Sequence, residues 1–503
     1  MMNRRDLIAT GAAAAALAPA AGVIAAPVRS GSPLDTHDAL GLANLVRQRQ
    51  VSASELLEEA ILRTEALNPR FNFMAQKHYD LGRAAIAAGL PEGPFSGVPW
   101  LVKDLNTTIA GEVTENGSRF YKGDRASVTS EIVTRAQKAG FVVFGKTAAP
   151  EFGLSASTEN KLQGDTRNPW NPAHIAGGSS GGAAVAVAAG VLPAAHATDG
   201  GGSIRIPASC CGLFGLKPSR GRIPMGPTRT EGWGGLSVHH AITRSVRDSA
   251  AIMDVTHGVE LGSRYAAPTP DGTFLSYVDK APRPVRIALM LAPASGSPVD
   301  AEAIEAARAA ARLCEALGHH VEETTPKLDA AAIGAASFVL SASSIAADLL
   351  DRAKATGLVP GPDNLEAITL AFFGYGQQTT GMDFARANNT LQTAAVEVAS
   401  FMQSYDLILS PTLAAPPLEL GRINLSPDVD FAQWGQRIAV FSPFAQLANL
   451  TGQPAMSVPL ATSASGLPMG AMFMARYGDE VTLFQLAGQL EKAAPWADKR
   501  PRL

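Results

Sequence analysis

Two glycine-rich segments of the chain each carry a serine. Ser179 lies in the segment Gly-Gly-Ser-Ser-Gly-Gly at residues 177–182, and Ser203 directly follows the three glycines at residues 200–202. Successive glycines allow several backbone N–H groups to point at one position, because no Cβ atoms stand in the way. Such converging donors stabilise the oxyanion that forms when a serine attacks a carbonyl carbon. The pattern predicts serine-based acyl transfer.

A serine nucleophile needs a base, and Lys103 is the candidate that the sequence offers. It follows the apolar run at residues 98–102, which predicts a short buried strand. A lysine that such a strand carries into the interior loses hydration, which lowers its pKa and makes the neutral amine available as a base. The alternative for Lys103 is a side chain that follows the apolar surface and keeps its ammonium group in water.

Residues 140–147 match the P-loop pattern of nucleotide-binding proteins letter by letter, but their chemistry does not fit it. A P-loop needs small residues, so that its N–H groups can surround a phosphate. The four central residues here are Phe-Val-Val-Phe, which favour an extended, half-buried strand, and a helix is expected before them. The segment is therefore interpreted as a strand, and no nucleotide is expected to bind.

Residues 177–181 also contain G-x-S-x-G, the nucleophile elbow of α/β-hydrolases, with Ser179 at its centre. An elbow follows a strand, whereas residues 168–172 read as a loop. An esterase that uses Ser179 with a histidine and an aspartate stays open as an alternative, since later histidines could serve: His239, His240, His257, His319 and His320.

The elements that must position these residues follow from the hydrophobic pattern. A capping box at Ser52 and Glu55 begins a helix that Asn68-Pro69 is expected to stop. Strands without polar alternation alternate with helices, which predicts a parallel or mixed sheet covered on both faces. The expected strands are 98–102, 141–144, 285–291 and 407–409, and the expected helices between or after them are 130–139, 183–189 and 301–317.

Three separated motifs, in this order, resemble the amidase signature family. They are Gly-Val-Pro-Trp-Leu-Val-Lys-Asp at residues 97–104, the loop at 177–182, and Asp-Gly-Gly-Gly-Ser-Ile-Arg at 199–205. The resemblance runs from about residue 40 to the C-terminus and is thinnest between roughly 325 and 440. Within the family, three stretches are most similar to bacterial hydrolases of a cyclic amide dimer: residues 166–171, 219–223 and 495–496.

The resemblance implies a fold and a reaction. The fold would be α/β, a single α/β/α domain over residues 26–503, with a large mixed β-sheet covered by helices on both faces. The reaction would be hydrolysis of a linear or cyclic carboxamide through a serine acyl-enzyme. Ser203 would be the nucleophile, Ser179, after a cis peptide bond, would relay the proton, and neutral Lys103 would be the base.

The resemblance also assigns the loop around Ser203. Four backbone N–H groups would hold the oxyanion, those of Gly200, Gly201, Gly202 and Ser203. Three side chains would support the loop without touching substrate, those of Thr198, Asp199 and Arg205. Gly200 stands where relatives often carry a side chain, which leaves the backbone donors intact.

The expected partner is a small-molecule amide, and neither a metal nor another cofactor is expected. The sequence leaves open whether the amide is aliphatic, aryl, peptide or cyclic, because residues 325–440 would line the pocket. Aromatic candidates for that lining lie at 372–375 and 441–444. A non-catalytic amide-binding relative is a second alternative. The net charge of −3 argues against nucleic acid, and a homodimer is an open alternative for the assembly.

The N-terminus resembles an export signal. Arg4 and Arg5 precede an apolar stretch at residues 7–18, and small residues follow, which predicts a twin-arginine signal over residues 1–25. The mature enzyme would then be periplasmic or secreted, and cytoplasmic if the signal is not used. The alternative is an alanine-rich terminal helix. No segment is expected to span a membrane, because no other run holds about 20 apolar residues.

Overall fold

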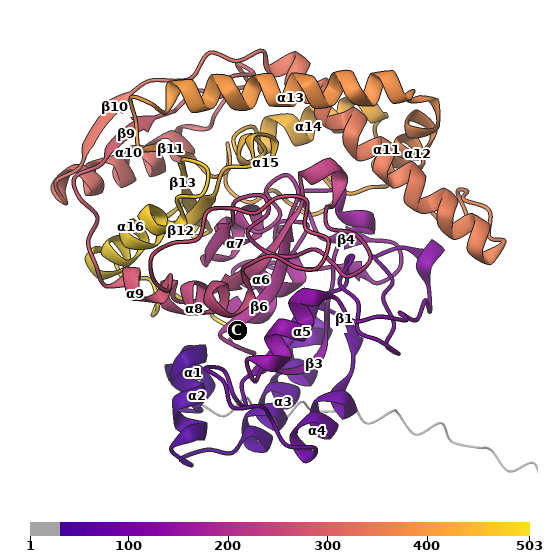
Figure 1. Cartoon of the computed structure of the whole chain (residues 1–503), viewed down its shortest axis with the longest axis vertical. Helices are drawn as coiled ribbons and strands as arrows, with labels where there is room; N and C mark the ends of the chain where they lie inside the picture. Colours follow the sequence, from indigo (N-terminus) through magenta and orange to yellow (C-terminus); the bar gives the residue numbers. More distant parts are fainter. Residues whose placement is uncertain (1–30) are drawn as a thin grey trace, which may run out of the picture.

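A mixed β-sheet of eight strands forms the centre of the computed structural model, which describes residues 31–503 (Figure 1). Its order is β10-β9-β11-β13-β12-β7-β8-β6, with β9 parallel to β10 and β11 and the other neighbours antiparallel. The strands are β6 (Ala194–Asp199), β7 (Phe214–Lys217), β8 (Val238–Thr243), β9 (Arg286–Leu289), β10 (His320–Glu323), β11 (Leu407–Pro411), β12 (Ala455–Thr462) and β13 (Pro468–Ala475).

A smaller sheet carries Lys103 to the edge of the large one. It has the order β1-β3-β2, with β1 at Met74–Lys77, β3 at Val142–Thr147 and β2 at Pro99–Lys103. Strand β2 lies beside β6, so Lys103 at the end of β2 meets the residues that precede the second glycine-rich loop. A separate two-stranded pair is formed by β4 (Glu159–Asn160) and β5 (Gly164–Asp165).

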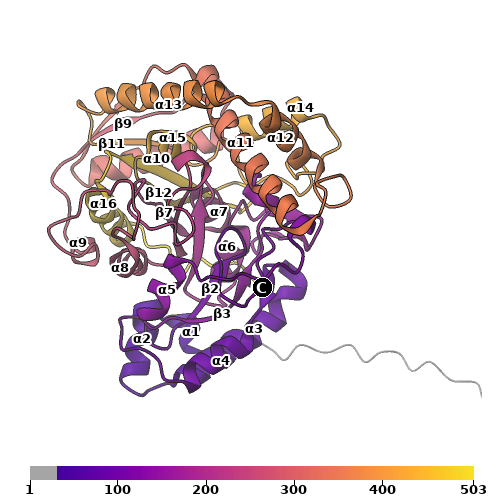
Figure 2. The ribbon, with the colours of Figure 1, turned by 45° about the vertical axis from the view of Figure 1, so that its right-hand side comes forward.

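Helices cover the large sheet on both faces, which confirms the predicted fold class. On one side α6 (Gly181–Ala188) and α7 (Arg205–Cys211) contact each other and the sheet, and α10 (Ala301–Ala316) packs on the same sheet. On the other side α8 (Val246–Thr256), α9 (Leu275–Val278) and α16 (Glu480–Ala493) contact one another. Figure 2 shows α6 and α7 on one side of β7 and β12, with α8 and α16 on the other.

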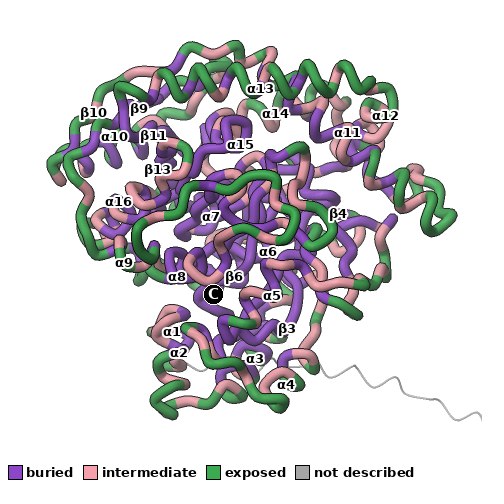
Figure 3. The backbone as a smooth tube through the Cα atoms, in the orientation of Figure 1, coloured by how far each residue is buried: buried purple, intermediate pink, exposed green. Residues whose placement is uncertain are grey.

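The remaining elements surround this core. Buried residues concentrate in the central strands and in α6 and α7, while the outer helices are partly exposed (Figure 3). The first group is α1 (Pro33–Thr36), α2 (Ala39–Arg47), α3 (Ala53–Phe71), α4 (Tyr79–Ala87) and α5 (Glu131–Lys138). The second is α11 (Ala330–Thr356), α12 (Ala367–Gln378), α13 (Gly381–Phe401), α14 (Phe431–Phe441) and α15 (Leu447–Thr451), and three short 3-10 helices are η1 (Arg119–Tyr121), η2 (Glu151–Gly153) and η3 (Trp233–Gly235).

Helix α3 begins at the predicted capping box but ends later than expected. Ser52 and Glu55 make the reciprocal hydrogen bonds of the box. The predicted stop at Asn68-Pro69 is wrong, because the helix continues through Pro69 to Phe71. A proline lacks only its own N–H donor, and in the last turn that loss leaves the later hydrogen bonds possible. The N–H group of Asn72 still donates to the carbonyl oxygen of Asn68.

The segment that matches a P-loop is a strand, as its residue types predict. Gly145, Lys146 and Thr147 lie within β3 and are buried. The Nζ atom of Lys146 donates to the carbonyl oxygen of Thr107 at 2.9 Å, so this lysine is occupied by the protein itself.

Helix α11 bears on the expectation that no segment spans a membrane. Within residues 31–503 it is the one helix long and apolar enough to cross a membrane by length and composition. No membrane span was expected from the sequence, and this helix meets the criteria of length and composition only. The contacts of α11 are those of a core helix, because it packs along α12 and α13 and buries Leu340 and Ile345. The predicted export signal lies outside the described residues.

Candidate active site

Lys103 is fully buried and holds two hydroxyl groups. Its side chain has 0% exposure. Its Nζ atom lies 2.7 Å from Oγ of Ser179 and 2.8 Å from Oγ1 of Thr198. The alternative in which this side chain reaches water is therefore not what the structure shows.

Burial lowers the pKa of Lys103 well below its ordinary value, and the carboxylate of Asp199 only partly opposes that shift. The charged form of an amine is disfavoured where water is excluded, so burial favours the neutral amine of Lys103. A neutral amine has a free lone pair, and the neighbouring Ser179 hydroxyl lies within reach of it. The pair has the geometry of a base and the group from which it takes a proton.

The loop that carries Ser179 is fixed by close backbone packing. The peptide bond between Gly178 and Ser179 is cis. A Cβ atom at Gly178 would lie 2.6 Å from the carbonyl oxygen of Ser157, so no larger residue fits there without a shift. Ser180 donates its hydroxyl to the carbonyl oxygen of Thr198 at 3.1 Å, which ties this loop to β6.

A buried ion pair shapes the loop that carries Ser203. Asp199 accepts hydrogen bonds from the N–H groups of Gly202 at 2.7 Å and Ile204 at 3.1 Å. Arg205 donates to both carboxylate oxygens of Asp199, each at 3.0 Å. Although burial opposes it, the Arg205 guanidinium lowers the pKa of Asp199 to about 2. Asp199 is therefore a carboxylate at every working pH, and its contacts are those of a loop support.

The N–H groups expected to hold an oxyanion are not equivalent. That of Gly202 is already donated to Asp199. Among residues 31–503, the N–H groups of Gly200, Gly201 and Ser203 have no hydrogen-bond partner. A Cβ atom at Gly200 would lie 3.1 Å from the Trp233 ring, which explains why a glycine suits this chain here.

Part of the surroundings of Lys103 was not predicted from the sequence. Thr198 was expected only to support the loop, yet its hydroxyl contacts Nζ of Lys103 directly. His196 was not singled out, and its Nδ1 accepts the N–H group of Lys103 at 3.1 Å. Both residues lie two apart on β6 and so share one face of the strand. This spacing of two residues is the sequence feature from which their shared position beside Lys103 could have been predicted.

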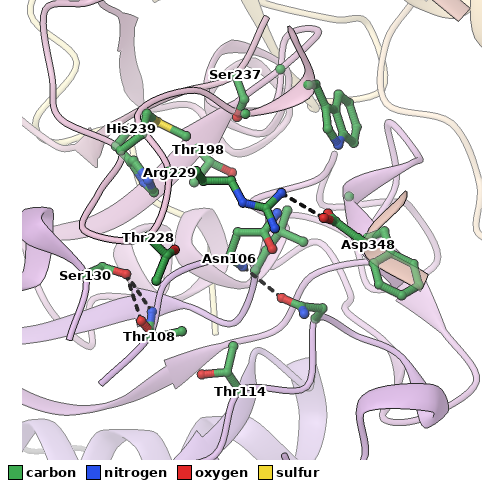
Figure 4. A pocket seen from close by; sticks show the side chains of 18 of the residues that line it. Asn106, Thr108, Thr114, Ser130, Thr198, Thr228, Arg229, Ser237, His239 and Asp348 are labelled. Carbon is green, nitrogen blue, oxygen red and sulfur yellow. Dashed lines mark hydrogen bonds and ion pairs between the residues drawn. The ribbon is translucent and has the colours of Figure 1, made fainter. Parts of the chain in front are cut away.

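Two cavities meet at the Ser203 loop. One, of about 240 Å³, is polar and is drawn in Figure 4; it is lined by Ser179, Thr198, Ser203 and His239 together with Asn106, Thr108, Thr114, Asn116, Ser130, Arg229, Glu231 and Asp348. Arg229 and Asp348 form an ion pair across it at 2.8 Å. The other, of about 270 Å³, is mostly apolar and is lined by Ser203, Gly201 and Gly178 with Leu154, Trp233, Phe338, Phe372, Trp434 and Ile438.

The expected lining from residues 325–440 is present on the apolar side. Phe372, one of the aromatic candidates, lines the cavity with Phe338 and Trp434, which the sequence did not single out. Phe441 and Phe444 lie in the hydrophobic core instead.

The elbow alternative is not assembled in this structure. Among residues 31–503 no histidine forms a hydrogen bond with Ser179, whose hydroxyl is held by Lys103. His240 contacts Ser249 and His319 contacts Gln489, both at 2.9 Å. The described residues also contain no group of three or more His, Cys, Asp or Glu side chains that could hold a metal ion.

Comparison with known proteins agrees with this geometry. Residues 55–484 match the family model for amidases. The chain therefore belongs to the amidase signature family, and it is an amidohydrolase.

Two relatives within the family match nearly the whole chain. The chain is 36% identical over 484 residues to the 6-aminohexanoate-cyclic-dimer hydrolase of Paenarthrobacter ureafaciens, covering 93% of this chain and 97% of that protein. It is 38% identical over 469 residues to a putative amidase AmiC of Mycobacterium leprae, covering 92% and 96%. The expected resemblance to hydrolases of a cyclic amide dimer is thus confirmed.

Solved structures show the same fold. A 6-aminohexanoate cyclic dimer hydrolase complexed with substrate matches with a TM-score of 0.87 and 35% identity, covering 93% of this chain and 98% of that one. A bacterial aryl acylamidase of the amidase signature family matches with a TM-score of 0.84 and 28% identity, again covering 93% and 98%.

Proposed function

We propose that the chain hydrolyses carboxamides through an acyl-enzyme on Ser203, with Ser179 as proton relay and neutral Lys103 as base. The observation that carries the proposal is the 2.7 Å contact between Nζ of Lys103 and Oγ of Ser179. The Lys103 side chain that makes this contact is fully buried. Ser179 and Ser203 line the same polar cavity, so a substrate carbonyl there can reach both hydroxyls.

In the proposed reaction, Ser179 relays a proton between Ser203 and Lys103, and Lys103 later returns a proton to Ser179. Ser203 attacks the carbonyl carbon while its proton passes to Oγ of Ser179 and the Ser179 proton passes to Lys103. The resulting oxyanion is stabilised by the free N–H groups of Gly200, Gly201 and Ser203. The C–N bond then breaks as Ser179 protonates the leaving nitrogen and Lys103 returns its proton to Ser179. Water attacks the ester by the same route and releases the acid.

We further propose that the two halves of the substrate occupy different cavities. Ser179 protonates the leaving nitrogen, and it lines only the polar cavity, so the amine half lies there. Gly201, a free oxyanion donor, lines only the apolar cavity, so the acyl half extends toward Phe338 and Trp434. The favoured substrate class is therefore an amide with an apolar acyl group and a polar amine.

A pair of isomeric amides tests this assignment. N-(methoxyethyl)hexanamide should have a kcat/KM at least about tenfold above that of N-pentyl-β-methoxypropanamide, because each CH₂ group buried in an apolar site contributes about 0.8 kcal/mol. Phe338→Ala should reduce that ratio, while Phe401→Ala, at a half-buried aromatic residue of α13, should not. An equal or reversed preference in the wild-type enzyme would reject the assignment. Including an anilide, a dipeptide amide and a cyclic lactam dimer in the panel decides the type of amide.

We also propose that the chain is exported by the twin-arginine route. Replacing Arg4 and Arg5 with lysine should leave folded, active precursor in the cytoplasm, because that route carries finished proteins. N-terminal sequencing of material from outside the cytoplasm should find a start near Ala26. Active enzyme that is recovered only from the cytoplasm with residues 1–25 intact would contradict the proposal.

A further inference from the structure

Two buried histidines form a chain of hydrogen bonds that starts at the backbone of Lys103. Nδ1 of His196 accepts the N–H group of Lys103 at 3.1 Å, and Nε2 of His196 lies 2.9 Å from Nδ1 of His239. The antiparallel pairing of β6 with β8 places His239 opposite Thr198 and diagonally across from His196. None of the catalytic steps proposed above uses these two rings.

The chain of hydrogen bonds fixes the position of each ring proton. A backbone N–H group can only donate, so Nδ1 of His196 carries no proton. A neutral His196 therefore carries its proton on Nε2 and donates it to Nδ1 of His239. A neutral His239 must in turn carry its proton on Nε2.

Both rings are neutral in the working pH range. Each side chain is buried, with 1% exposure. Burial, together with the positive charge that His239 or Lys103 would place nearby, lowers the pKa of His196 well below its ordinary value. Burial and Lys103 lower the pKa of His239 to about 4. The tautomers set by the hydrogen bonds thus persist at neutral pH.

The last proton of the chain faces the polar cavity. His239 lines that cavity beside Thr198, as Figure 4 shows. Its Nε2 atom has no hydrogen-bond partner among residues 31–503, and it is not among the fully enclosed polar atoms without partners. The N–H group is therefore held ready for a group that enters the cavity.

We infer that the Nε2–H group of His239 is a fixed donor for an acceptor oxygen on the amine half of the substrate, with His196 as the positioning residue that sets its direction. The inference rests on the proposed function, since it places the amine half in the polar cavity. It adds to that function a substrate feature, a carbonyl, ether or hydroxyl oxygen beyond the leaving nitrogen. A donor whose orientation is fixed in advance loses little conformational entropy on binding.

Two substrates of the same shape test the inference. N-acetonylhexanamide has a carbonyl oxygen in its amine half, and N-isobutylhexanamide replaces it with a methyl group. The wild-type ratio of kcat/KM should favour the ketone, and His239→Leu should lower that ratio about fivefold to tenfold, as expected for one hydrogen bond between neutral groups. His239→Gln should keep most of the ratio, because its amide nitrogen can donate from a similar position.

Stability separates recognition from a structural role. Both variants leave the Nε2–H group of His196 without its acceptor, so their thermal midpoints should fall by similar amounts. A ratio that His239→Leu leaves unchanged, or that both variants lower equally, would overturn the inference. If the wild-type enzyme hydrolyses neither amide of this pair nor any of the wider panel, the proposed function fails instead.

A spectroscopic measurement tests the donor without turnover. In protein with ¹⁵N-labelled histidine, the ring nitrogens of His196 and His239 should show protonated Nε2 and unprotonated Nδ1 between pH about 8 and about 6. A proton on Nδ1 of His239 would overturn the inference even if the enzyme is fully active.

Discussion

Ser203→Ala is expected to lower kcat by a factor on the order of 10⁶ while the fold is kept. The reason is that the proposed acyl-enzyme forms on this hydroxyl, and Ser203 lines both the polar and the apolar cavity. Among residues 31–503, no hydrogen bond involves the Ser203 side chain, so its removal leaves no protein group without a partner. Oxyanion donors and binding alone account for the remaining activity.

The measurement is kcat on the best amide of the panel, with the thermal midpoint measured in parallel. Ser400→Ala, at an exposed serine of α13, is the matched control and should change neither value. If Ser203→Ala keeps more than a few per cent of the activity while Ser179→Ala is inactive, Ser179 is the nucleophile and the elbow chemistry is right.

Replacing Lys103 is expected to be nearly as severe, and the substituting residue separates charge from shape. Lys103→Met keeps the length of the side chain without its amine, so it should be almost inactive while packing is largely retained. Lys103→Arg should not restore activity, because a guanidinium cannot give up its proton at working pH. An active Lys103→Arg enzyme would exclude lysine as the base.

The pH dependence gives an independent check on Lys103. Its pKa is lowered by burial, and the base must be neutral to act. Activity should therefore be present above the lowered pKa and be lost as the pH falls through it. In the wild-type enzyme the acid limb of kcat/KM should lie well below the pKa of about 10.4 of a free lysine. A rise in activity only above that value would mean that Lys103 stays charged.

The local motifs allowed much of the site to be predicted. Gly-rich loops constrain their own backbone, and apolar runs set their own strands, so Ser179, Ser203 and the strand of Lys103 follow from neighbouring residues. The same local logic rejected the P-loop, since Phe-Val-Val-Phe favours an extended strand, and Val142, Val143 and Phe144 lie in β3. It was less reliable at the end of α3, where a proline in the last turn did not stop the helix.

Contacts between distant segments had no such local signal. The hydroxyl of Thr198 on Lys103 and the pair of His196 and His239 exist because β2, β6 and β8 lie side by side. Nothing in the sequence near Trp434 or Phe338 shows that their rings share a cavity with the Ser203 loop. Likewise, only the folded loop shows that Asp199 already uses the N–H group of Gly202.

The sequence by itself determined the family, the reaction class and the residues proposed to carry it, because each motif is a short run whose chemistry depends on its own residue types. The tertiary structure decided which residues line the polar and the apolar cavity, which N–H groups beside Ser203 are free, and that His196 and His239 are neighbours. These properties depend on strand order and on how α11 packs against α12, α13 and η3. Such packing is the sum of many contacts between residues far apart in the chain, and no local pattern encodes it.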